Sequence, residues 1–151
     1  MDSLNNINDD NKNMILEQYK LYVEMADKIS QQRSLTNSFY ITINTALLAF
    51  VGIKGETMDI FLYVIAGIGI VLSILWFFNI RSYSQLNSGK FQIIHQMEEL
   101  MPFRVYKTEW EFLGKGEKWS VYYPVSHIEK CVPIVFSILY LSVIAIKIFK
   151  L

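Results

Sequence analysis

The residue types that could carry out acid–base chemistry or bind a metal ion are few in this sequence. His95 is followed by Glu98 and Glu99, a spacing that brings side chains to one face of a helix. An imidazole beside a carboxylate could act as a general base or supply two metal ligands. No further ligand type stands nearby, so a solvated helix face is the favoured interpretation. The sequence predicts no catalytic residue, no cofactor and no metal site.

Other short motifs give weaker signals. Residues 87–90, Asn-Ser-Gly-Lys, resemble the end of a phosphate-binding loop but lack its upstream glycine and fall in a helical pattern. His127 lies inside Ser126–Glu129, which has the spacing of a helix capping box. The single cysteine, Cys131, cannot form an intrachain disulfide or a multi-cysteine metal site. A formal net charge of zero gives no electrostatic basis for binding nucleic acid.

Asn44 is the one strongly polar side chain deep in an apolar segment. An amide in hydrocarbon needs partners on neighbouring helices or water in a pore, and both interpretations stay open. No acidic or basic residue lies in the middle of an apolar segment, which argues against a proton relay, a voltage sensor or a transporter of charged substrates.

Small residues accompany Asn44 at helical spacing in two apolar segments, an arrangement that lets helices approach closely. Such stripes serve either the packing of one chain or contacts between copies. The helix-packing or pore-lining candidates are Thr42, Asn44, Thr45, Ala49, Gly52, Ala66, Gly69 and Ser73.

The elements that must position these residues are membrane spans. The chain of 151 residues is 52% hydrophobic, its mean hydropathy is +0.27, and residues 60–78 contain no charge. At about 1.5 Å per residue, such a stretch covers the hydrocarbon thickness of roughly 30 Å. The predicted fold is an all-α integral membrane protein with three transmembrane helices, at residues 39–53, 60–80 and 131–149.

Long amphipathic helices are expected to extend these spans on the cytoplasmic side. We expect a disordered tail at 1–12, an amphipathic helix at 13–38, an external turn at 54–59, and a cytoplasmic helix followed by an aromatic loop at 81–130. No Pro or Gly lies between Asn11 and Val51, so the first amphipathic helix should continue directly into the first span. Pro102 should end the second.

The amphipathic helices carry apolar stripes that would be exposed if each helix stood alone. Exposed patches of that extent usually mark interfaces between proteins. The candidates for a cytoplasmic interface between copies are Ile15, Tyr19, Tyr22, Ala26, Ile29, Phe91, Ile94 and Met97.

Lys and Arg predict the orientation. The segment before the first span holds four and residues 81–130 hold seven, against one in the 54–59 turn and two near the C-terminus. By the positive-inside bias, the N-terminus and residues 81–130 are cytoplasmic, and the turn and C-terminus are external.

Several stretches are similar to one family. They are Tyr19–Arg33, Thr36–Tyr40, Asn44–Leu48, Trp110–Gly116 and Ile128–Pro133. With these stretches, the chain resembles the bacterial RipA family of octameric membrane proteins. The match spans nearly the whole chain. The resemblance implies a bacterial cytoplasmic-membrane protein assembled as an octamer, and it brings no enzymatic activity or functional residue with it.

The expected function is therefore that of a non-enzymatic oligomeric inner-membrane protein, either a scaffold or a component related to stress or fitness. Its partners would be membrane lipid and further copies of the chain; any small-molecule ligand is unknown. Three alternatives stay open: an oligomeric pore or channel, a membrane-tethered enzyme using His95 or the loop at 110–123, and an effector like the SLATT-type proteins of nucleotide-dependent defence systems. The order of elements resembles the last group, from which the third span departs.

Overall fold

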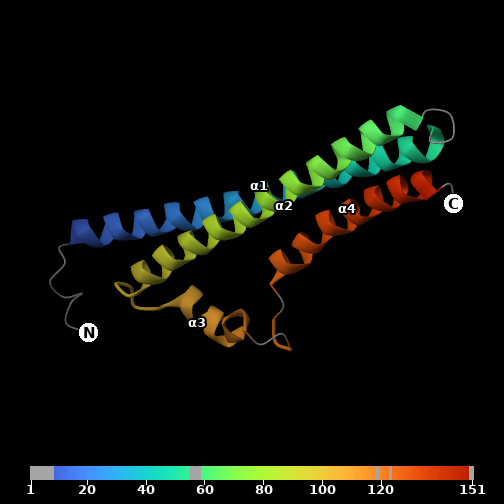
Figure 1. Ribbon diagram of the computed structural model, residues 1–151. Helices are drawn as coiled ribbons and strands as arrows, with labels where there is room; N and C mark the ends of the chain where they lie inside the picture. The colour runs from blue at the N-terminus through green and yellow to red at the C-terminus, as the bar shows by residue number, and fades with distance from the viewer. Residues whose placement is uncertain (1–8, 55–58, 118–119, 123, 150–151) are drawn as a thin grey trace. The chain divides into compact units, whose positions relative to one another are not determined.

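The computed structural model describes residues 9–54, 59–117, 120–122 and 124–149. Helices are its regular elements there (Figure 1), and the prediction of an all-α fold is confirmed. In chain order they are α1 (Asp9–Lys54), α2 (Asp59–Glu98), α3 (Val105–Phe112), the short 3₁₀ helix η1 (Gly114–Gly116) and α4 (Val125–Phe149).

The first helix is continuous over 46 residues. This agrees with the absence of Pro and Gly from residues 12–51, because those residues interrupt helices most often. Residues 9–12 were expected to belong to a disordered tail but are helical. Acidic residue types at positions 9 and 10 suit the positive end of the helix dipole, which explains the earlier start. The rest of the expected tail, residues 1–8, lies outside the described residues.

The second helix ends at Glu98, three residues before the position expected from Pro102. The chain then tightens into turns, in which the backbone N–H of Glu99, Leu100 and Met101 each donate to the carbonyl three residues earlier, at 3.2, 3.0 and 3.1 Å. The α conformation is disfavoured for Met101 because it precedes Pro102, so the regular α-helix ends before the proline.

The aromatic loop expected in the second part of residues 81–130 contains a helix, α3, that was not predicted from the sequence. Aromatic and β-branched residues at alternating positions obscured its helical spacing. Three consecutive residues after it, Gly114, Lys115 and Gly116, have positive φ angles of 66°, 56° and 70°. Glycine adopts that conformation without strain and therefore suits the turn.

Three helices are long and apolar enough to cross a membrane, at Asn11–Ile53, Ile60–Glu98 and Val125–Phe149, as the sequence predicts. The first, with 43 residues, would be about 65 Å long, roughly twice the thickness of the hydrocarbon. Only part of it can lie in lipid. Residues 55–58 of the expected external turn lie outside the described residues.

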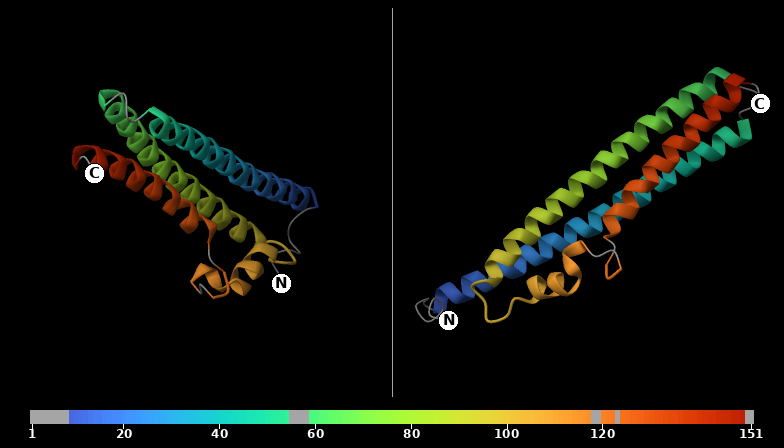
Figure 2. Two further views of the ribbon diagram at one scale, coloured as in Figure 1. Left: turned by 90° about the vertical axis from the view of Figure 1, so that its right-hand side faces the viewer. Right: turned by 60° about the horizontal axis from the view of Figure 1, so that its bottom comes forward.

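The chain forms two compact units. The first, which we call the α3 unit, contains residues up to Gln32 and Tyr83–Pro124; the second, the span unit, contains Arg33–Ser82 and the residues from Val125 onward. In each unit, a part of α1 lies beside an antiparallel part of α2 (Figure 2).

One end of the span unit has a purely apolar core. Val51 from α1 packs with Leu62 and Ile65 from α2, and Leu47 and Val143 cover them. Most other large apolar side chains of the span unit are exposed; in α4 only Pro133 and Tyr140 are buried. Such surfaces are the ones that lipid or further chains would cover.

Candidate functional sites

Asn44 lies at the centre of a polar layer inside the span unit and is 0% exposed. Its amide nitrogen donates to the Tyr40 carbonyl at 2.8 Å, and its side-chain oxygen accepts from the Tyr140 hydroxyl at 3.2 Å. That hydroxyl also lies 3.0 Å from the Asn44 carbonyl. Ser73 donates to the Gly69 carbonyl at 2.9 Å, and its oxygen lies 3.4 Å from the Asn44 side chain. Residues of the same chain therefore satisfy the Asn44 side chain.

Gly69 makes room for the Tyr140 ring. A Cβ atom built on Gly69 would lie 2.5 Å from Cε1 of Tyr140 and closer still to its Cζ, distances that carbon atoms do not tolerate. Close approach of this kind is the reason for small residues in membrane helices. Asn44, Gly69 and Ser73 were predicted from the sequence, but Tyr140 was not, because its phenol is one of several hydroxyl groups in the span at 131–149.

Aromatic rings and amides form a second layer in this unit. Trp76, 1% exposed, stacks on Tyr40 with ring centroids 5.6 Å apart and planes 6° apart, and donates its indole N–H to Asn37 at 2.9 Å. Asn79 donates to the Tyr40 hydroxyl at 2.9 Å. Phe136 of α4 lies 6.0 Å from the Trp76 ring. In this layer, hydrogen bonds connect α1 with α2, and the ring contact of Phe136 adds α4.

Glu129 makes a contact other than the one expected. The capping box predicted a helix start at Ser126, but α4 begins at Val125. The Glu129 carboxylate lies 3.4 Å from Nε of Arg33, and both side chains are about one-fifth exposed. This ion pair connects α1 with α4 within the span unit.

The small residues on α1 and α2 have different surroundings. Ala66, Gly69 and Ser73 on α2 are buried within the span unit. Thr42, Thr45, Ala49 and Gly52 on α1 are all exposed, and nothing lies within 4 Å of a Cβ built on Gly52. The two stripes therefore do not pack against each other within the chain.

The buried carboxylate of the α3 unit belongs to Glu98, which is 0% exposed. Its Oε1 accepts from the Tyr19 hydroxyl at 3.0 Å and from the backbone N–H of Tyr106 at 2.8 Å. Its Oε2 accepts from the backbone N–H of Lys107 at 2.9 Å. Both oxygens are thus engaged, and the carboxylate joins the end of α2 to α1 and α3.

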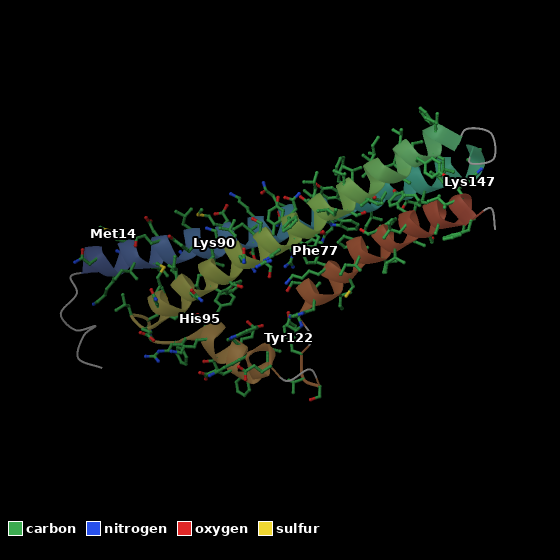
Figure 3. The ribbon with its side chains drawn as sticks, in the orientation of Figure 1. Met14, Phe77, Lys90, His95, Tyr122 and Lys147 are labelled. Carbon is green, nitrogen blue, oxygen red and sulfur yellow. The ribbon has the colours of Figure 1, made fainter. Side chains whose placement is uncertain are left out.

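His95 does not join Glu98 in a site of the kind considered from the sequence. It is half-buried near the end of α2 (Figure 3), with its ring centroid 6.4 Å from that of Phe91. Among the described residues, no group of three or more His, Cys, Asp or Glu side chains is placed to hold a metal ion. Residues 87–90 lie within α2 and form no loop; Lys90 has its ammonium 5.2 Å from the centroid of the Tyr22 ring.

Tyr106 is the aromatic centre of the α3 unit, with its ring 6.5 Å from Tyr19 and 5.7 Å from Phe91. Trp110 packs edge-on against Tyr122, labelled in Figure 3, at 6.5 Å. Gly116 lies under Trp110, with 3.1 Å between the indole and a Cβ built on that glycine. The turn after α3 is therefore folded onto the helix.

The charge environment of Tyr106 is negative. Burial raises the pKa of its phenol, and the carboxylates of Asp27, Glu109 and Glu98 raise that pKa further. The phenol therefore stays neutral at physiological pH.

The eight apolar candidates for a cytoplasmic interface are all buried or half-buried within one chain. Ala26 is 3% and Ile94 0% exposed. Stripes expected to face other copies thus face inward in the α3 unit. The apolar side chains that remain exposed there include Leu16, Leu21, Met25, Leu86, Phe103 and Phe112.

Three helices long and apolar enough to cross a membrane define a multi-pass helical membrane protein. The family model of the Octameric membrane protein family (8xMP) matches residues 16–149, and the chain belongs to that family. The resemblance found in the sequence is thereby confirmed. Neither the comparison with curated proteins nor that with solved structures gives a match.

Proposed function

We propose that this chain is a non-enzymatic subunit of a homo-octameric scaffold in the bacterial cytoplasmic membrane. The name of its family describes octameric membrane proteins. The N-terminus and residues 81–130 would face the cytoplasm, because these segments contain most of the Lys and Arg residues and such segments usually lie on the cytoplasmic side.

The observation that carries this proposal is apolar exposure outside the predicted spans. Lipid accounts for exposed Ile and Leu in residues 39–53, 60–80 and 131–149, but not for those of the α3 unit. Phe103 and Phe112 are each 81% exposed there, and Leu21 and Met25, four residues apart on α1, are 54% and 40% exposed. Contacts with further copies would remove these side chains from water.

Native mass spectrometry of the protein released from nanodiscs tests the stoichiometry. The expected species contains eight chains, and a protein that is monomeric after mild extraction would overturn the proposal. Replacing Leu21 and Met25 together by Glu is expected to reduce the octamer. The matched control places two Glu residues at the exposed polar positions Gln18 and Gln32. An octamer that survives the first change as well as the second would exclude the Leu21 face from the interface.

A second candidate, a pore around the axis of the octamer, is favoured by one observation. Thr42, Thr45, Ala49 and Gly52 form an exposed stripe on α1 within a predicted span. Hydroxyl groups on such a face suit water better than lipid, although Thr42 donates within its own helix to the Ser38 carbonyl at 2.8 Å. In this arrangement Asn44 supports the packing of each subunit and the threonines line the pore.

Ion flux into liposomes distinguishes the two candidates. A pore predicts flux from the wild-type protein that changes when Thr42 and Thr45 are both replaced by Val. Ser142→Ala removes an exposed hydroxyl from α4 and serves as the control. Octamers that carry no flux would leave the scaffold as the function.

A further inference from the structure

The helix α3 has few means of its own to stay folded. It contains eight residues, the residue before it, Arg104, makes no side-chain capping hydrogen bond, and no residue within it is fully buried. Isolated helices shorter than about 12 residues are marginal in water. A helix with a capping side chain gains stability because that side chain satisfies backbone N–H groups of the first turn, and α3 has no such group next to it in sequence.

The carboxylate of Glu98 supplies the missing cap from another helix. Tyr106 and Lys107 are the second and third residues of α3, and their backbone N–H groups donate to Oε1 and Oε2 at 2.8 and 2.9 Å. These positions are the ones that an N-cap side chain normally serves. The negative charge also lies at the positive end of the α3 dipole.

No lysine neutralises Glu98 directly among the ion pairs of the described residues. The ammonium of Lys107 lies 3.2 Å from the carboxylate of Glu99 instead. Because Glu98 is 0% exposed, water does not solvate its charge. The hydrogen bonds from the two amides of α3 and from the hydroxyl of Tyr19 are therefore what stabilises the buried charge of Glu98. In return, the carboxylate of Glu98 caps the first turn of α3.

We propose that Glu98 is a conformational latch. The segment 105–112 is helical only while this carboxylate docks on its first turn. When the contact is lost, α3 leaves α1 and α2 and unfolds, which uncovers the faces of Tyr19 and Phe91 that pack on Tyr106. The latch makes α3 an element with two states, docked and released, and it does not depend on the number of subunits.

Hydrogen exchange of the full chain in detergent micelles tests the latch. Glu98→Gln keeps the size of the side chain but removes its charge and one acceptor oxygen. Amides of residues 105–112 are expected to exchange about tenfold faster or more, with α4 unchanged. Glu99→Gln is the matched control: the neighbouring residue loses the same charge but caps nothing, so the expected change is under about twofold. Unchanged exchange of α3 in Glu98→Gln would overturn the proposal.

Two further variants separate the latch from aromatic packing and from general loss of structure. Tyr106→Ala removes the ring but keeps the backbone N–H, and is expected to accelerate exchange of α3 less than Glu98→Gln does. An equal or larger acceleration would mean that the ring holds α3, which contradicts the latch. If Glu98→Gln does not yield folded protein, Glu98→Asp retains the charge with a shorter reach and should accelerate exchange in the same residues; protection equal to wild type there would also contradict the latch.

Discussion

Gly69→Ala tests the packing of the span unit most directly. The new Cβ would lie 2.5 Å from Cε1 of Tyr140 and closer to its Cζ, so the ring must move. That movement separates the Tyr140 hydroxyl from Asn44, to which it now lies at 3.0 and 3.2 Å. Overpacking costs about 1–3 kcal/mol, and an interhelical hydrogen bond in a membrane about 0.6 kcal/mol on average. The expected loss from these two causes is about 2–4 kcal/mol.

Gly67→Ala provides the matched control on the same helix. Nothing lies within 4 Å of a Cβ built on Gly67, and both substitutions gain the same preference of Ala for a helix, about 1 kcal/mol. The difference between the two variants therefore isolates the contact with Tyr140. Unfolding titrations in mixed micelles, followed by far-ultraviolet circular dichroism, measure both free energies. The double variant with Tyr140→Ala should remove most of the clash, because the ring is absent.

Equal stability of the Gly69 and Gly67 variants would refute this reasoning. It would mean that α4 can move away from α2 at little cost, and that the polar layer does not fix the position of α4. A double variant as unstable as the two single changes added together would show that Gly69 and Tyr140 do not interact.

Three further outcomes are expected. Asn44→Leu should lower the free energy of unfolding by about 1 kcal/mol and leave any ion flux into liposomes unchanged, because the amide faces its own chain; altered flux would contradict that placement. Trp76→Phe should cost about 1–2 kcal/mol in the same unfolding titration, since Asn37 loses its indole donor; an unaltered midpoint would contradict it. Burial raises the pKa of Tyr106 above 10.0, so its contribution to stability is complete below pH 10 and is lost as the pH rises further. Tyr106→Phe should weaken this alkaline loss of stability, and an identical pH profile would contradict the assignment.

The sequence predicted those features that depend on the local pattern alone. Nineteen consecutive residues without charge, 60–78, allow few structures other than a membrane span. The absence of Pro and Gly from residues 12–51 predicted the continuity of α1. Polar or small residues in apolar helices predict close contacts between helices, and three of them, Asn44, Gly69 and Ser73, do meet in one layer.

A single sequence does not show which helix faces pack against each other when they lie far apart along the chain. The pattern of Ile15, Tyr19 and Tyr22 shows that one helix face needs cover, but not whether α2 of the same chain or another copy covers it. The helix α3 was missed for a related reason: its cap, Glu98, lies on a different helix, and its contact with the Tyr106 amide crosses eight residues. Local capping patterns do not include such a residue.

Small residues illustrate how one signal can have two meanings. The stripes on α1 and α2 share the same residue types, yet Tyr140 occupies the space above Gly69 while the face of Gly52 is empty. In lipid, apolar helices gain little from burial alone, so close packing and hydrogen bonds decide which faces pair. Tyr140 packs closely against Gly69 of α2 and donates hydrogen bonds to Asn44 of α1, and the Arg33–Glu129 ion pair also holds α4 to α1. The α2 stripe is therefore used within the chain, whereas the α1 stripe stays exposed on the surface of the span unit.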